Sequence, residues 1–157
     1  MKNEYLNIYN NLIKLTRNKN LYHNLKNDDT FSDRLVVLLL HLGFFLKTYK
    51  DSLSKEEAQD LFDFIIRQIE LSIREIGYGD VSVNKKMKDY VNLFYSILEK
   101  IEKSDLNNNE NLLILLKKYI NSEKNMVFYV DYFNKYRLFL TKNTLNNFTK
   151  DIINLNF

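Results

Sequence analysis

The sequence predicts an all-α fold. Apolar residues recur at helical spacing along most of the chain, no stretch has the sustained alternation of a strand, and no proline interrupts a helix. A chain of 157 residues suits one domain that buries roughly two thirds of the surface its unfolded form would expose. We therefore expect a single compact helical domain over residues 1–157, with about seven to eight helices.

Apolar spacing predicts a first helix over about residues 4–16 and a short helical piece over residues 20–26. Polar residues at 28–33 then offer several N-caps for the apolar run Leu35–Leu46. This run is apolar on nearly all sides but shorter than the roughly 17 to 25 residues of a membrane span, so we expect a buried central helix. His41 interrupts the run, and we interpret it as a hydrogen-bonded histidine at the edge of the core.

Ser54 and Glu57 have the spacing of a capping box, which predicts the start of the next helix. Gly77 is expected to end that helix with a positive φ. The face of this helix expected to be buried consists of Leu61, Phe62, Ile65, Ile69, Ile73 and Ile76. Another face, expected to form a solvated ladder of ion pairs, consists of Asp63, Arg67, Glu70 and Arg74.

A further helix is expected after Gly79, with Asp80 or Ser82 as its N-cap. Its expected buried stripe consists of Met87, Tyr90 or Val91, Phe94, Leu98 and Ile101. Its expected first turn carries three lysines, which are Lys85, Lys86 and Lys88. Cations there oppose the helix macrodipole, so the stability of the helix does not explain them.

The segment 104–109 is polar and is expected to be a loop, followed by helices over residues 112–120, 126–140 and 145–153. The middle one of these helices carries an aromatic stripe, which consists of Tyr129, Tyr132, Phe133, Tyr136 and Phe139. We interpret this stripe as core rather than as a platform for a ligand, because aromatic residues at helical spacing are the usual buried face of a helix.

The formal net charge is only +3, but the charge is unevenly placed. The segment Ser54–Asp80 has three basic and seven acidic side chains, whereas Asn111–Phe157 has seven basic and three acidic ones, so we expect a polarised molecule. The absence of Cys and the presence of only two His argue against a metal centre. The N-terminus resembles neither a signal peptide nor a transit peptide, so we expect the protein to stay where it is made.

No familiar nucleotide-binding, hydrolase or metalloprotease motif is present, and we expect neither catalysis nor a cofactor. The segment Gly77–Asp80 with the lysines after it superficially resembles a phosphate-binding loop, but Asp80 would repel a phosphate there. The alternative that stays open is a helix-turn-helix-like nucleic-acid-binding module. Against it, the expected turn is longer than the usual three to four residues, and only Asn84 could read base edges near the start of the second helix.

Five motifs follow one another in the middle of the chain: Leu21–Thr30, Arg34 with Leu40–Leu42, Leu61–Asp63, Arg74–Lys88 and Phe94–Tyr95. The most specific is Arg-Glu-x-Gly-x-Gly-Asp-x-x-Val, from Arg74 to Val83. In order and spacing, residues 21–95 resemble the ubiquinol–cytochrome c chaperone family. The chain departs from the family pattern at Asp33, Asn84 and Ser96–Ile97, where Gly, Pro and Gly-Arg are usual, and these departures bear on the rigidity of the turn.

The resemblance implies a non-catalytic assembly factor that binds newly made cytochrome b and promotes assembly of ubiquinol–cytochrome c reductase, complex III of the respiratory chain. It also implies action at the inner face of a bacterial membrane, without a transmembrane segment or specific nucleic acid, and with the ribosome or a small co-chaperone as further partners. The expected partner-binding residues are Arg74, Glu75, Gly77, Tyr78, Gly79, Asp80, Lys85, Lys86 and Lys88. The other residues of the family motifs are Arg34, His41, Asp63, Met87, Phe94 and Tyr95.

Overall fold

The computed structural model describes residues 2–23, 25, 30–122, 126–151 and 153–157. Within these residues every regular element is a helix and no strand occurs, which confirms the predicted all-α fold. The elements are α1 (Lys2–Thr16), the 3-10 helix η1 (Lys19–Leu21), α2 (Phe31–Tyr49), α3 (Lys55–Ile76), α4 (Asp80–Lys103), α5 (Asn109–Tyr119), α6 (Val127–Lys142) and α7 (Leu145–Phe148).

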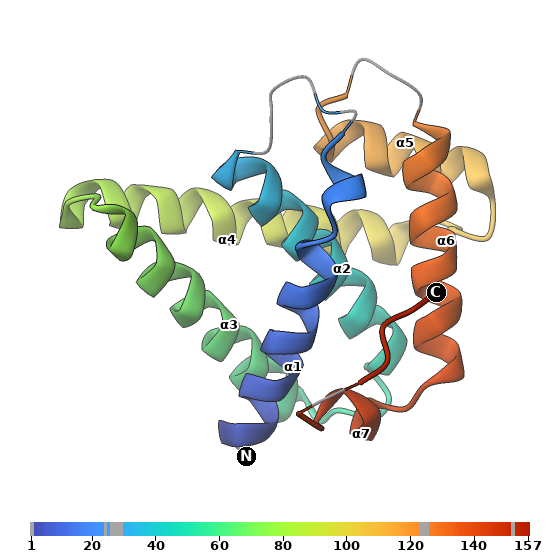
Figure 1. Cartoon of the computed structure of the whole chain (residues 1–157), viewed down its shortest axis with the longest axis horizontal. Helices are drawn as coiled ribbons and strands as arrows, with labels where there is room; N and C mark the ends of the chain where they lie inside the picture. Colours follow the sequence, from blue (N-terminus) through green and yellow to red (C-terminus); the bar gives the residue numbers. More distant parts are fainter. Residues whose placement is uncertain (1, 24, 26–29, 123–125, 152) are drawn as a thin grey trace.

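Helix α2 lies at the centre of the molecule, and α1, α4 and α6 pack around it (Figure 1). A capping box starts α2: the Thr30 hydroxyl accepts a hydrogen bond from the Asp33 N–H at 3.1 Å, and the Asp33 carboxylate accepts one from the Thr30 N–H at 3.4 Å. The segment from Val37 to Phe45 is buried without interruption. The predicted buried central helix is therefore confirmed.

Helix α2 packs closely on α4 at Gly43. A Cβ atom at this position would lie 2.9 Å from Ile101 Cδ1 and 3.1 Å from Ile97 Cγ2, both closer than ordinary van der Waals contact. The missing side chain therefore lets the two helices approach each other directly.

The aromatic stripe of α6 belongs to the core as predicted, with Tyr129, Tyr132, Phe133 and Tyr136 buried and Phe139 half-buried against Phe148 and Phe157. The Tyr136 hydroxyl donates a hydrogen bond to the carbonyl oxygen of His41 at 2.9 Å. In the opposite direction, the Tyr49 hydroxyl of α2 donates to the carbonyl oxygen of Leu140 at 2.7 Å. Each phenol contributes apolar surface while its hydroxyl keeps a hydrogen-bond partner, so these tyrosines join α2 and α6 without leaving a buried polar group unsatisfied.

Helices α3 and α4 form a hairpin whose turn projects away from the other helices (Figure 1). Phe62 and Phe94 stack across the hairpin with ring centroids 5.3 Å apart. The predicted inner face of α3 is buried as far as Ile73, but Ile76 is 53% exposed and was wrongly assigned to that face. Ile76 is the last residue of α3, at the projecting end of the hairpin, where few neighbouring side chains can cover it.

The last predicted helix is shorter than expected. It was predicted over residues 145–153, but α7 ends at Phe148, and residue 152 lies outside the described residues. The Asn7 side-chain amide donates to the carbonyl of Thr149 at 2.7 Å, and that of Asn11 donates to the carbonyls of Phe148 and Lys150 at 3.1 and 3.2 Å. These carbonyls thus bond to α1 rather than to a continuing helix.

The short helical piece predicted over residues 20–26 is also reduced. The structure has η1 only from Lys19 to Leu21, and residues 24 and 26 lie outside the described residues. The Asn18 side chain starts η1 by accepting a hydrogen bond from the Asn20 N–H at 3.1 Å.

Candidate functional site

The turn between α3 and α4 consists of Gly77, Tyr78 and Gly79. Gly77 has φ 105° and its N–H donates to the Arg74 carbonyl at 3.0 Å, so the predicted left-handed end of α3 is confirmed. Gly79 has φ −71°, which any residue adopts, and nothing lies within 4 Å of a Cβ built there. A turn of three residues also means that the expectation of a connection too long for a helix-turn-helix was wrong.

The start of α4 differs from the prediction that Asp80 or Ser82 caps it. Gly79 is the N-cap, no side chain of the described residues accepts a capping hydrogen bond, and Asp80 is the first helical residue. The reason is that the Asp80 carboxylate accepts a hydrogen bond from Arg74 instead. Ser82 lies two residues further into the helix, past the capping position.

The Arg74 guanidinium connects the two helices across the turn. Its Nη1 lies 2.5 Å from Asp80 Oδ1 and its Nη2 lies 3.1 Å from Glu70 Oε1. The hydrogen bonds that Arg74 donates to Asp80 and, with a smaller effect, to Glu70 raise the pKa of Arg74. The Glu70–Arg74 pair is one link of the predicted ladder, whereas Asp63 accepts a hydrogen bond from Gln59 at 2.8 Å. Arg74 thus fixes the end of α3 against the first residue of α4.

The lysines of α4 lie further from the helix start than predicted. Because α4 begins at Asp80, Lys85, Lys86 and Lys88 fall beyond its first turn, where the macrodipole has little effect. The predicted conflict with the helix dipole is therefore wrong. The Nζ atom of Lys86 lies 4.6 Å from the ring centroid of Tyr78, which is a cation–π contact between α4 and the turn. Lys85 and Lys88 are exposed.

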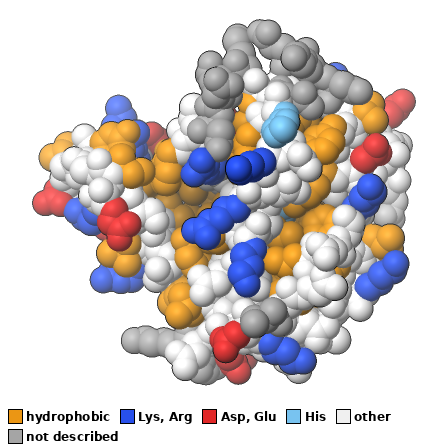
Figure 2. Space-filling model, in the orientation of Figure 1, with side chains coloured by type: hydrophobic (Ala, Val, Ile, Leu, Met, Phe, Trp, Pro, Cys, Tyr) orange, Lys and Arg blue, Asp and Glu red, His pale blue; other side chains and the backbone are white. Residues whose placement is uncertain are grey.

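Three apolar side chains in the α3–α4 turn and next to it project into solvent. Val81 is 86% exposed, Ile76 is 53% exposed and Tyr78 is 43% exposed. We use the name tip surface for the residues Arg74, Ile76, Tyr78, Asp80, Val81 and Lys86. Figure 2 shows hydrophobic, basic and acidic side chains side by side at the left end of the molecule, over the α3–α4 turn.

Sequence reasoning did not assign Ile76 and Val81 to the binding site. A signal for Val81 was nevertheless available in the sequence, because Val83 lies four residues before Met87 and so extends the predicted buried stripe of α4, and the structure buries Val83 fully. Residues two apart on a helix do not share a face, so Val81 had to point elsewhere. Glu75, which was predicted to bind a partner, is exposed beside the tip surface.

His41 belongs to the core. Its Nδ1 lies 2.7 Å from the Val37 carbonyl oxygen and its Nε2 lies 2.6 Å from the Tyr132 hydroxyl. Burial lowers the pKa of His41 to about 4, so the ring is neutral at pH 7. A carbonyl can only accept, so Nδ1 carries the proton and Nε2 accepts from Tyr132. The prediction of a hydrogen-bonded histidine is confirmed, although the side chain lies inside the core rather than at its edge.

The other motif residues are not gathered at the tip surface. Phe94 is buried, and Tyr95 stacks on the same ring of Phe62, with centroids 5.8 Å apart. Met87 is half-buried against the core, whereas Arg34, in the first turn of α2, is exposed. These residues therefore lie in the core or on surfaces other than the tip surface.

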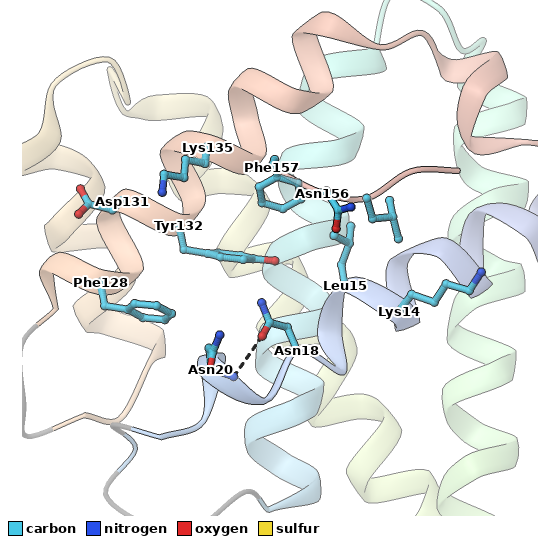
Figure 3. Close-up of a pocket in the computed structure, with 11 residues that line it drawn as sticks. Lys14, Leu15, Asn18, Asn20, Phe128, Asp131, Tyr132, Lys135, Asn156 and Phe157 are labelled. Carbon is cyan, nitrogen blue, oxygen red and sulfur yellow. Dashed lines mark hydrogen bonds between the residues drawn. The ribbon is translucent and has the colours of Figure 1, made fainter. Parts of the chain in front are cut away.

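The close-up in Figure 3 shows a pocket of about 600 Å³ between the end of α1, α6 and the C-terminal segment. Its aromatic wall includes Tyr132 and Phe157, whose ring centroids are 5.6 Å apart. Its charged residues are Lys14, Asp131 and Lys135, which do not form a recognisable catalytic arrangement. Across the described part of the chain, no group of three or more His, Cys, Asp or Glu side chains could hold a metal ion.

None of the described helices is both long enough and apolar enough to cross a membrane. The described residues thus define a helical protein with a projecting hairpin tip (Figure 1) that exposes apolar and charged side chains together. By sequence, the chain belongs to the ubiquinol-cytochrome C chaperone family, whose family model matches residues 23–131, more than half of the chain. No curated protein and no solved structure matches the chain.

Proposed function

We propose that this protein is a non-catalytic assembly chaperone that binds newly made cytochrome b and promotes assembly of ubiquinol–cytochrome c reductase. The client contacts the tip surface. The observation that carries this proposal is the exposure of Val81, Ile76 and Tyr78 together at the end of a projecting hairpin. Single exposed apolar side chains are ordinary, but adjacent ones with charged neighbours are typical of interaction sites.

The construction of the turn supports the proposal. Gly77 sets the backbone by its positive φ, the Arg74 guanidinium joins both helices, and Lys86 lies over the ring of Tyr78. A surface held in one conformation before binding loses less entropy when a partner binds. This chain therefore presents its apolar side chains in a fixed arrangement that suits a chaperone with a specific client.

The remaining features of the proposal come from the family. From the resemblance to this family we propose that the chaperone acts at the inner face of a bacterial membrane, without a cofactor, and that the ribosome or a small co-chaperone is a further partner. The lysines next to the tip surface, Lys85 and Lys88, are exposed and would lie close to anything bound there.

A deletion strain complemented with matched variants tests the proposal. The tip variant Ile76→Ser with Val81→Ser should lower co-purification of cytochrome b and the level of assembled reductase, with unchanged transcript. The control is Ile114→Ser with Leu138→Ser, because these side chains on α5 and α6 are 68% and 54% exposed and lie outside the tip surface. Full capture by a folded tip variant would contradict the proposed site, and normal assembly in the deletion strain would contradict the proposed function.

The lysines are tested separately. Replacing Lys85, Lys86 and Lys88 by Gln should lower the melting temperature only slightly, because Lys85 and Lys88 are exposed and the half-buried Lys86 loses a single cation–π contact with Tyr78. Capture of cytochrome b should fall and should depend less on salt than in the natural chain. Unchanged capture would remove the lysines from the site, and DNA or RNA binding that falls steeply with salt would favour a nucleic-acid-binding function instead.

A further inference from the structure

A pocket of about 510 Å³ lies between α1, α2 and α3 and shares no residue with the tip surface. Its volume is in the range of pockets that hold small molecules. Much of its wall is apolar and is formed by Tyr9, Ile13, Phe31, Leu35, Leu38 and Ile69. Phe31 is exposed and Tyr9 and Ile13 are half-buried, so apolar surface is open to a ligand that enters.

The charged residues of this pocket are mostly basic. Lys14 and Arg17 are exposed and lie at the end of α1, and they line the pocket with Arg34. Arg34 makes an interaction of its own, so the positive charge available to a ligand is that of Lys14 and Arg17. Asp151 is the one carboxylate among the described residues that line the pocket. In Figure 2, Lys and Arg side chains form a row next to hydrophobic ones over α1 and the start of α2.

We propose that this pocket binds an anionic lipid with a single acyl chain. The charged headgroup lies at Lys14 and Arg17, and the acyl chain lies against Phe31 and the half-buried apolar wall. Removal of the chain from water supplies most of the affinity, and the exposed cations select an anionic headgroup over a neutral one. This inference does not rest on the proposed function, because it concerns different residues and a different kind of ligand.

Calorimetric titration of the full chain with laurate tests the proposal, with dodecanol and acetate as matched probes. Dodecanol keeps the chain without the charge, and acetate keeps the charge without the chain. Laurate should bind more tightly than either. Equal binding of laurate and dodecanol, or no binding of laurate, would overturn the proposal.

Variants locate the bound headgroup. Lys14→Gln with Arg17→Gln should weaken laurate binding about threefold to tenfold, since each exposed ion pair contributes modestly. Asp151→Asn should strengthen binding up to about threefold, because it removes the repelling carboxylate. The charge-matched control, Lys117→Gln with Lys142→Gln, changes exposed residues that do not line the pocket and should leave binding unchanged. Equal weakening by the control would show a non-specific charge effect and overturn the proposal.

The apolar wall and the source of the lipid are tested with Phe31→Ala. This variant should weaken laurate binding while both cations remain in place. Binding to vesicles of phosphatidylglycerol distinguishes a single lipid molecule held in the pocket from adsorption of the protein to a bilayer surface. If such vesicles bind the natural chain and the Phe31→Ala variant equally, and laurate does not bind, then Lys14 and Arg17 bind a membrane surface and the pocket proposal fails.

Discussion

At the residue scale, His41 makes the stability of the protein depend on pH. Burial lowers the pKa of His41 from 6.5 to about 4, so protonation of the ring costs more free energy in the folded state than in the unfolded chain. The contribution of the neutral ring to stability is complete above pH 6.5 and is lost as the pH falls toward 4. We expect a loss of about 3 kcal/mol of unfolding free energy from this residue across that range.

Urea denaturation at pH 7 and pH 4.5 measures this effect. The His41→Gln variant should be less stable at pH 7, because it disturbs a buried hydrogen bond to Tyr132, but its stability should change less between the two pH values. The control is the same His→Gln change at the exposed His23, measured at the same two pH values. If the natural chain and His41→Gln lose equal stability on acidification, His41 is not the cause.

Single residues show how far the sequence could predict the site. Gly77 was predicted correctly because a glycine that ends a helix is a local signal. The role of Asp80 was predicted incorrectly, because an aspartate near a helix start can either cap that helix or pair with a cation elsewhere. Which of the two occurs depends on where Arg74 lies in space. The spacing from Val83 indicated that Val81 points away from the buried stripe, but its place at the projecting end of the hairpin (Figure 1) depends on how the helices pack.

At the scale of the element, the two glycines of the α3–α4 turn differ in backbone conformation, so a side chain is tolerated differently at each position. Gly77→Ser should destabilise the protein by about 1 to 2 kcal/mol, because a side chain is strained at φ 105°. Gly79→Ser should instead stabilise it by a few tenths of a kcal/mol, because φ −71° is ordinary, the position is open, and Ser is a better N-cap than Gly. Thermal unfolding of both variants checks the two signs. Similar effects of both variants would contradict the assignment of the left-handed position to Gly77 alone.

Whole elements were predicted best where the signal is local. The capping box at Ser54, and the candidate N-caps at 28–33 directly before the apolar run of α2, are each signals within a few residues, and the starts of α3 and α2 follow from them. The end of α7 did not follow, since it depends on side chains of α1 that lie far away in sequence. Periodicity within α7 contains no information on such contacts.

At the scale of the whole molecule, the core extends beyond the matched residues 23–131. Helix α1 lies before this segment, and most of α6, including Tyr132 and Tyr136, lies after it. Both helices pack against α2. We therefore propose that residues 1–157 form a single domain, in which α2 cannot be covered by the matched segment alone.

A shortened chain of residues 23–131 tests this proposal. It should not unfold cooperatively, and it should bind a hydrophobic dye, because removal of α1 and most of α6 exposes the apolar sides of α2. Calorimetry and dye fluorescence of the shortened and full chains measure the difference. A cooperative transition in the shortened chain, with no dye binding, would show that the domain is smaller than proposed.

The uncapped start of α4 has a consequence for hydrogen exchange. The first backbone amides of a helix have no acceptor within it, and in α4 no described side chain caps them, so the amides of Asp80, Val81 and Ser82 should exchange with solvent deuterium rapidly in the free protein. The Val83 amide, which donates to the Gly79 carbonyl at 2.9 Å, should exchange more slowly. A client on the tip surface would slow exchange at the three open amides, so binding could be followed on the natural chain without any substitution.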